Sequence, residues 1–359
     1  MIPYILINSY LFASALIKND RILHYINFFV IFLICSTYYN GSDWRGYEPV
    51  YNSIETGRSN WNFSVYLIFS FFQGIGMSFH AMLMTCKLLV AFSVYRFIRK
   101  YSPAPQFAFS VFILLGGYYL FIDNPFRQML AVPFVLWFFS SLMEKKWIQV
   151  ALSLLIGASL HSSVLLLSPL IILRSKMQKN STAILFLIAV FLTMTITDNW
   201  LLYSSQFLAG IPEIGYYARH YMFEADSRII SGSSLIYLVI MIIYFIKRGD
   251  RYLDKYDFFG VLLFATIILS IKLPEMLRFS VYLFIPFAIS LSHKLYGKKM
   301  MKLRGIVVLL CIVLSANVML SSYKYFPYTN YVYSYLTNQE KSYSYRYNFH
   351  LDRYNGNND

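Results

Sequence analysis

Charged residues are scarce in this chain. Only 13% of its 359 residues are Asp, Glu, Lys or Arg, whereas 58% are hydrophobic. Soluble domains are typically about 25% charged and 45–50% apolar, so the composition indicates a membrane protein. Acidic residues are scarcer still, with 17 Asp and Glu against 31 Lys and Arg, for a formal net charge of +14. A nucleic-acid-binding domain would gather such charge on one polar face, but here the basic residues fall between apolar runs.

Cysteine is also rare. The three cysteines, Cys35, Cys86 and Cys311, lie far apart, each inside an apolar run, and no C-x-x-C pair occurs. This excludes a secreted disulfide scaffold, and we interpret the three as small buried hydrophobic residues. Intrinsic disorder is excluded by the 32 Phe, 32 Tyr and 5 Trp, because chains so rich in aromatics bury enough apolar surface to fold. A multi-pass membrane protein remains.

Apolar runs suited to membrane-spanning helices recur along the chain. A span needs about 20 mostly apolar residues, fewer where the bilayer thins or the ends snorkel. Candidate spans are residues 2–17, 25–40, 79–98, 106–122, 128–143, 182–198, 233–247, 257–272, 279–295 and 305–321. The apolar stretch 148–173 is broken at Ser159–Ser163 and suits two short helices in a tight hairpin. The prediction is an all-α polytopic integral membrane protein with about 10–12 transmembrane helices, forming a single integral membrane domain over residues 1–359.

The first 17 residues are interpreted as a span rather than a removable signal peptide, because they lack a basic n-region and an A-x-A-type cleavage site. Clusters of Lys and Arg, such as Arg96/Arg99/Lys100, then mark one side of the membrane as cytoplasmic. Three longer polar segments would face outward: residues 40–78, residues 198–232 and a Tyr-rich tail, 322–359. Within the first, residues 61–73 are too short to span and are predicted to form an interfacial or re-entrant helix.

The tail contains ten tyrosines between Tyr323 and Tyr354. Two interpretations stay open. The rings form an aromatic belt at the membrane surface with a partly ordered end, or they form a platform on which sugar rings stack.

Basic residues in short outer loops run against the positive-inside bias and are candidates for function. Arg127 follows helix-breaking Pro125 in the segment DNPFRQMLA. With Gln128 it falls at the start of the next helix, where free backbone N–H groups and the helix dipole favour an anion. Arg127 is therefore a candidate ligand for a phosphate, the alternatives being a salt bridge to Asp123 or snorkelling to headgroups.

Arg278 lies in KLPEMLRFSVY, after Pro274 at the predicted outer face. A local ion pair with Glu275 is one interpretation. The other is that Lys272, Arg127 and Arg278 converge on one outer cavity and hold a diphosphate.

His161 lies in GASLHSSVLLLSPL, at the break of the predicted hairpin. It is either a hydrogen-bonded packing residue or a functional one, because the small residues around it leave polar room. In the second case it acts as a general base or contacts a phosphate.

The segment NGSDWRGYEPVYN combines two carboxylates, an Arg and three aromatic residues within nine positions. Carbohydrate sites use such side chains, with acceptors for hydroxyl groups and rings for stacking. The predicted glycan-binding residues here are Trp44, Arg45, Tyr47 and Tyr51. Asp43 or Glu48 would deprotonate an acceptor hydroxyl. A solvated loop explains the charges but explains the aromatics less well.

The loop 198–232 adds Arg219 and His220, which are also predicted to bind glycan. Its Glu224-Ala-Asp226 pair has the spacing of metal-binding carboxylates, but a solvated turn is the favoured interpretation. No D-x-D motif occurs in the chain, which argues against a glycosyltransferase that uses a metal-bound sugar nucleotide. We expect no metal and no cofactor.

Taken in order, these segments resemble the EpsG-like branch of the bacterial Wzy-type polysaccharide polymerases. The matching features are Gly-Ser-Asp-Trp with Tyr47 and Tyr51, Arg127-Gln128 followed by Ala131, the His161-Ser-Ser turn, and Arg278 with Tyr282. The resemblance covers about residues 25–320 and lies in the combination rather than in any one motif.

The resemblance implies a transfer on the outer face of the bacterial plasma membrane. A growing glycan on undecaprenyl diphosphate would move onto the non-reducing end of a lipid-linked repeat unit, for O-antigen, capsule or exopolysaccharide synthesis. The donor carries its own diphosphate leaving group, so no nucleotide is needed. Expected partners are these lipid-linked oligosaccharides, membrane lipids and a chain-length regulator, with no nucleic acid.

On this hypothesis Arg127, Arg278, Lys272 and Gln128 bind the diphosphate, and Tyr282 joins the glycan-binding residues. The candidates for the base are Asp43, then His161, then Glu48. The alternatives are an O-antigen ligase, with the same donor and face, a flippase or transporter of the lipid-linked oligosaccharide, and a membrane acyltransferase. A transporter would have charged residues along its spans and an internal repeat, but only Lys87 lies well inside a predicted span.

Overall fold

The computed structural model describes residues 2–17, 21–53, 63–171, 232–246, 257–270, 275–320 and 322–356. The chain divides into two compact units. Unit 1 comprises Met1–Ser168 and Gly297–Asp359, and unit 2 comprises Pro169–Tyr296. Every regular element in the described ranges is a helix, and an isolated antiparallel bridge joins Thr37 to Asn330. The predicted all-α class is therefore confirmed, and the fold is that of a polytopic membrane protein.

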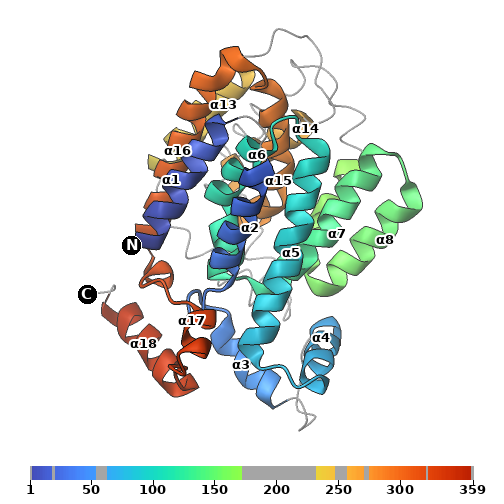
Figure 1. Ribbon diagram of the computed structural model, residues 1–359. Coiled ribbons are helices and arrows are strands. Elements are labelled where there is room, and N and C mark those ends of the chain that lie inside the picture. The colour runs from blue at the N-terminus through green and yellow to red at the C-terminus, as the bar shows by residue number, and fades with distance from the viewer. Residues whose placement is uncertain are drawn as a thin grey trace, which may run out of the picture. The chain divides into compact units, whose positions relative to one another are not determined.

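Seven helices of unit 1, rich in apolar residues, pack against one another. They are α1 (Ile2–Leu16), α2 (Arg21–Cys35), α5 (Phe79–Tyr101), α6 (Pro105–Phe112), α7 (Phe126–Met143), α8 (Trp147–Leu160) and α16 (Met301–Leu320). The N-terminal helix α1 contacts α6 and also α16, which is far away in the sequence. The helices α7 and α8 form an antiparallel hairpin, and α5 packs against α2 and α7 (Figure 1).

Three of the described helices are long and apolar enough to cross a bilayer: α5, α7 and α16. Seven shorter apolar helices accompany them in the described part of the chain. These include α1, α8 and α13 (Gly232–Ile246), each close to a predicted span. The number of spans, about 10–12 on the hydropathy argument, stays a prediction, as does the single domain.

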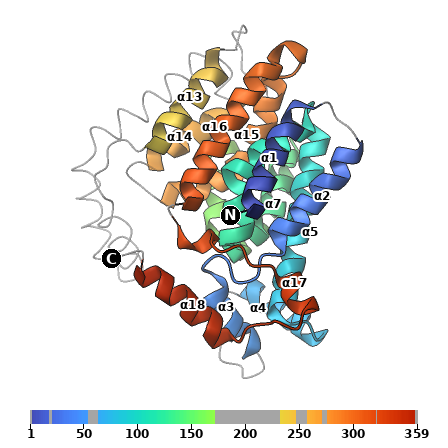
Figure 2. The ribbon, with the colours of Figure 1, turned by 60° about the vertical axis from the view of Figure 1, so that its left-hand side comes forward.

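Four further helices gather at one end of unit 1. They are α3 (Trp44–Asn52) and α4 (Phe63–Gly74) from the predicted first outer loop, and α17 (Tyr331–Leu336) and α18 (Tyr343–Gly356) from the tail. Figures 1 and 2 both show α3 beside α18 below the longer helices. The predicted interfacial helix at 61–73 corresponds to α4. The tail, for which a partly ordered end is one interpretation, forms the helices α17 and α18, joined by the non-helical residues 337–342.

The chain between α6 and α7 is irregular where the site begins. Two π-helices, η2 (Ile113–Gly117) and η3 (Tyr119–Asp123), continue α6, and Asn124 adopts a left-handed conformation with φ of 60°. Pro125 precedes the first residue of α7, as expected from its fixed φ and missing N–H. Gly41, with φ of 83°, lies against this end of η3, where a Cβ would overlap the carbonyl oxygens of Ile122 and Asp123.

The break predicted within the apolar stretch 148–173 is also found, while residues 172 and 173 lie outside the described residues. The helix α8 ends at Leu160, extended backbone at His161 breaks the chain, and the 3₁₀-helix η4 (Ser162–Leu167) follows. In unit 2, α13, α14 (Asp257–Ser270) and α15 (Glu275–Lys294) surround a buried polar cluster. There the Nζ of Lys294 lies 2.9 Å from an oxygen of Asp257, to which the Tyr244 hydroxyl also donates.

Candidate functional site

The segment Asn40–Asn52, predicted to be an outer loop, contains the helix α3, and this helix organises the candidate site. It presents its predicted functional residues on two faces. The first face is directed towards α4 and α7, and the second is directed towards the tail helix α18. Tyr47 contacts the rings of Phe69 and Phe126, on α4 and α7. Trp44 and Glu48, spaced four residues apart and therefore on one side of the helix, contact the tail helix α18.

At the first face, Asp43 joins α3 to α7. Its Oδ2 accepts a hydrogen bond of 3.2 Å from the backbone N–H of Phe126, the first residue of α7. Asp43 precedes α3 but makes no side-chain cap there. It thus satisfies one of the donors left free at the start of α7 and places a negative charge at the positive end of that helix dipole.

Arg127 and His161 lie at this same end of the α7–α8 hairpin. The Nε of Arg127 donates to the carbonyl oxygen of Leu160 at 3.1 Å, which holds the half-buried guanidinium beside the residue that precedes His161. The Nδ1 of His161 lies 2.6 Å from the Oγ of Ser163. We call Asp43, Tyr47, Arg127 and His161 the α7-end cluster.

The pKa of the Tyr47 phenol depends on the two charged side chains of this cluster, Asp43 and Arg127. Burial raises the pKa of its phenol, the Asp43 carboxylate raises it further, and the Arg127 guanidinium lowers it. The phenol therefore stays protonated at physiological pH and acts as a hydrogen-bonding group rather than as a base.

Asp123, the alternative partner of Arg127, pairs with another residue. Its carboxylate accepts from the Nζ of Lys324 at 3.1 Å and from the Oγ of Ser42 at 3.2 Å. The salt bridge proposed from the sequence between Arg127 and Asp123 is therefore wrong. Lys324 lies just after α16, so the Lys324–Asp123 ion pair also connects the start of the tail to the last residue of η3.

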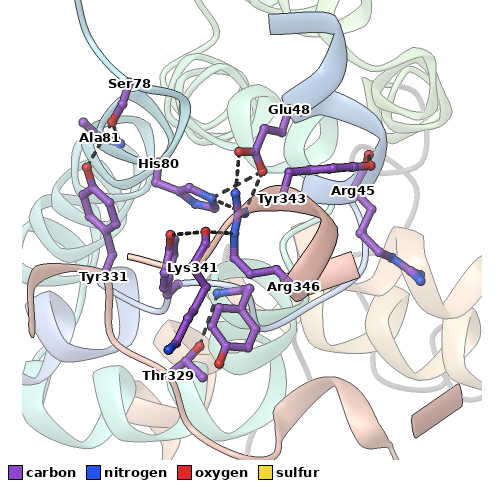
Figure 3. Close-up of polar contacts among 12 residues, drawn as sticks. Arg45, Glu48, Ser78, His80, Ala81, Thr329, Tyr331, Lys341, Tyr343 and Arg346 are labelled. Carbon is purple, nitrogen blue, oxygen red and sulfur yellow. Dashed lines mark hydrogen bonds and ion pairs between the residues drawn. The ribbon is translucent and has the colours of Figure 1, made fainter. Parts of the chain in front are cut away.

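At the second face, a buried ion pair joins α3 to α18. The Nη1 and Nη2 atoms of Arg346 donate to the two carboxylate oxygens of Glu48 at 2.7 and 2.6 Å, a bidentate arrangement (Figure 3). Nη1 also lies 2.6 Å from the Nε2 of His80, on the first turn of α5. Arg346 is 3% exposed, Glu48 6% and His80 7%, so the three form a desolvated triad.

Aromatic rings surround this triad. The Arg346 guanidinium carbon lies 5.0 Å from the Trp44 ring centroid, 5.2 Å from that of Tyr38 and 6.0 Å from that of Tyr343. Cation–π attraction and the Glu48 pair together compensate for burial of the charge. Burial raises the pKa of Glu48, but its contacts with His80 and Arg346 outweigh this and lower the pKa to about 2. Glu48 is therefore poorly suited to the predicted role of general base.

A cavity of about 480 Å³ opens beside the triad. Its walls come from the end of α2, from α3, from the α4–α5 connection and from the tail. The lining residues are Tyr38, Glu48, Tyr51, Asn52, Gln73, Gly76, Met77, Ser78, Phe79, His80, Glu340, Lys341, Ser342, Tyr343 and Arg346. We call it the tail cavity. Tyr51 is the predicted glycan-binding residue that lines it.

The remaining predicted residues are placed differently. Trp44 is 1% exposed and packs on Arg346, and Arg45 donates to the Ser42 carbonyl oxygen. Gln128 and Tyr282 are buried. Arg278 lies in the first turn of α15, in unit 2. Lys272, Arg219 and His220 lie outside the described residues, as does nearly all of the loop 198–232.

Sequence reasoning missed Arg346, His80 and Tyr343, which complete the second face. Arg346 does have a signal, since it is a charged residue in a predicted surface tail among tyrosines. Nothing in the spacing of the chain connects it to Glu48, because the two are 298 residues apart.

The comparison with protein families covers most of the chain. A model described as the EpsG family matches residues 4–336. Neither the search of curated proteins nor that of solved structures found a match. The family match extends over unit 2 and all of unit 1 except its first three residues and the tail beyond residue 336. The chain therefore belongs to the EpsG family and is a membrane protein of polysaccharide synthesis.

Proposed function

We propose that this chain is a polysaccharide polymerase. It transfers a growing glycan from undecaprenyl diphosphate to the non-reducing end of a lipid-linked repeat unit, on the outer face of the bacterial plasma membrane. The observation that carries the proposal is the α7-end cluster. It brings a cation, a carboxylate and an imidazole from three separate segments to one end of the α7–α8 hairpin.

Glycosyl transfer from a lipid diphosphate needs two things from the protein. The departing diphosphate gains negative charge, which a fixed guanidinium stabilises, and the acceptor hydroxyl must lose its proton. Arg127 supplies the guanidinium that stabilises the departing diphosphate. The Phe126 amide at the start of α7 is already bound to Asp43, so the guanidinium rather than that amide is the proposed diphosphate ligand. Asp43 and His161 are the candidates for the base, since both carboxylate oxygens of Glu48 already accept hydrogen bonds from Arg346.

The proposal predicts the phenotype of an Arg127→Ala variant. Loss of one preorganised charge-stabilising group typically costs about 100- to 1,000-fold in rate, so chain extension should fall by that order while the protein inserts normally. Cells would accumulate single repeat units, seen as one short band on a gel of surface polysaccharide. Arg127→Lys retains the charge but not the bidentate fork and should recover only part of the activity.

Arg99→Ala is the matched control, because Arg99 is an exposed arginine in the last turn of α5, whereas the candidate site lies at the first turn of that helix. It should give a normal ladder of polymer. A normal ladder from Arg127→Ala would contradict the assignment. A deletion strain that still makes polymer ladders but fails to attach them to lipid A would replace polymerase with ligase.

A further inference from the structure

We propose that the tail cavity is a binding site for an uncharged oligosaccharide segment. That this segment belongs to the lipid-linked repeat unit rests on the proposed polymerase function. The cavity itself is a feature of the described structure, with a volume of about 480 Å³. Small-ligand sites typically measure about 300–1,000 Å³.

The lining combines ring faces with polar groups. Tyr343 brings a partly exposed aromatic ring to the cavity, and Tyr51, which is 2% exposed, forms part of the wall behind it. Their hydroxyls donate to the carbonyl oxygens of Arg45 and Met77 at 2.8 and 2.6 Å. These bonds hold the rings in place before a ligand arrives, which reduces the entropy lost on binding. A fixed aromatic ring presents a flat apolar face, and the C–H face of a pyranose is a suitable partner for it.

Two side-chain amides are available to hydrogen-bond sugar hydroxyls. Within the described part of the chain, no protein hydrogen bond engages the side chains of Asn52 and Gln73, which both line the cavity. An amide offers both donors and an acceptor, as hydroxyl groups require.

The charges of the lining favour an uncharged ligand. Glu48 and Arg346 neutralise each other in the bidentate pair. The other two charged lining residues, Glu340 and Lys341, are opposite in sign. The cavity therefore has no excess charge to attract a phosphate or a cation. This distinguishes it from the α7-end cluster, where Arg127 is available for an anion.

The wall supplied by the tail lies beyond the segment that the family model matches. The match ends at residue 336, whereas Glu340, Lys341, Ser342, Tyr343 and Arg346 line the cavity. Polysaccharides differ in their repeat units, so a wall outside the shared family segment is a suitable place for selectivity among sugars.

The test measures binding of a probe that has no lipid and no phosphate. The probe is the single repeat-unit oligosaccharide, released by mild acid from the lipid carrier of the cell that makes this protein. Its binding to the full-length protein in nanodiscs is followed by calorimetry or saturation-transfer NMR. Asn52→Ala and Gln73→Ala should each weaken binding by about fivefold, as expected for one lost hydrogen bond. Tyr343→Ala should weaken it by about tenfold.

Tyr345→Ala is the control. Tyr345 lies on the same helix, is 50% exposed and does not line the cavity, so this variant should bind like the wild type. Asn52 is also exposed, so its replacement does not threaten folding. Arg127→Ala should bind the probe normally while losing chain extension. Normal probe binding together with lost chain extension would show that the tail cavity and the α7-end cluster are separate sites.

The outcomes distinguish this inference from the proposed function. Wild-type binding of the probe by all three cavity variants would overturn the inference, even in a protein that makes polymer. Absence of saturable binding to the wild type would overturn it as well. Binding that depends on Asn52 and Tyr343 in a protein without polymerase activity would support the cavity and reject the polymerase.

Discussion

At the scale of single residues, the buried triad has a large energetic consequence. Desolvating two charges costs several kcal/mol per ion, and their attraction repays this only when the geometry is good. Glu48 and Arg346 meet that condition, with two hydrogen bonds of 2.6 and 2.7 Å and aromatic rings around the guanidinium. The pair is therefore sensitive to the loss of one partner.

Replacing Arg346 alone should strongly destabilise the protein. Removal of one member of a buried ion pair typically costs about 3–5 kcal/mol, because the other charge stays buried without compensation. Arg346→Leu should accordingly lower the thermal unfolding midpoint in detergent, and adding Glu48→Leu should recover part of the loss. Lys341→Ala, which removes an exposed cation on the same segment, is the control. A double variant less stable than Arg346→Leu would refute the argument.

The low pKa of Glu48 predicts how stability depends on pH. The pKa is lowered from 4.5 to about 2 in the folded protein, so the folded state binds the proton less readily than the unfolded state does. The resulting stabilisation is fully present above about pH 4.5 and is lost as the pH falls towards 2. The difference in unfolding midpoint between wild type and Glu48→Gln should therefore shrink between pH 5 and pH 2.5. A constant difference over this range would show that Glu48 does not titrate as described.

At the scale of secondary-structure elements, α3 decides the arrangement of the candidate site. The sequence NGSDWRGYEPVYN predicts part of an outer polar loop in which charges and aromatic residues cluster, whereas Trp44–Asn52 form a helix. Folding as a helix sorts these residues, because positions four apart share one side. Asp43 and Tyr47 reach α4 and α7, whereas Trp44 and Glu48 reach the tail.

Asp43 has a structural role at the start of α7, and this role can be separated from a catalytic one. Loss of a helix N-terminal carboxylate typically costs about 0.5–2 kcal/mol, so Asp43→Ala should lower the unfolding midpoint modestly. Asp43→Asn keeps an oxygen that can accept from the Phe126 amide and should be nearly as stable as the wild type. If Asp43 is the base, Asp43→Asn nevertheless loses chain extension. Normal polymer from Asp43→Asn would transfer the role to His161.

At the scale of the whole molecule, the predicted outer tail meets the predicted first outer loop and the residues just before it. The Tyr38 hydroxyl donates to the Lys341 carbonyl oxygen, and the Asn40 side chain accepts from the Thr329 backbone N–H. The isolated antiparallel bridge pairs Thr37 with Asn330. Because these segments pack against each other, we expect them to lie on the same side of the membrane. The topology derived from the positive-inside rule requires this too.

Cysteine labelling tests that topology. The native cysteines are buried and can be replaced by Ala. Asn52→Cys and Tyr345→Cys, at exposed positions of α3 and α18, should react with a membrane-impermeant maleimide in intact cells. Lys145→Cys, in the exposed turn between α7 and α8, should react only after the membrane is opened. Opposite labelling of positions 52 and 345 would contradict the packing of the tail on the first loop.

The sequence alone determined the class of the protein and much of its local structure. Apolar runs and scarce charges require a helical membrane protein, because backbone groups in lipid must be satisfied within the segment. Pro125 and the interruption at His161 predicted helix ends that the structure contains. These are local effects, readable from neighbouring residues.

Only the tertiary structure decided which residues share a site. Arg127 and His161 were singled out separately, and the α7–α8 hairpin brings them to one end. Glu48 was a candidate base until the tail placed Arg346 against it, and the tail cavity has no counterpart in any single segment. The physical reason is that contacts between distant segments depend on how helices pack, which local spacing does not encode. The sequence thus identified the family and the membrane, and packing determined which charges are paired and which are available for a substrate.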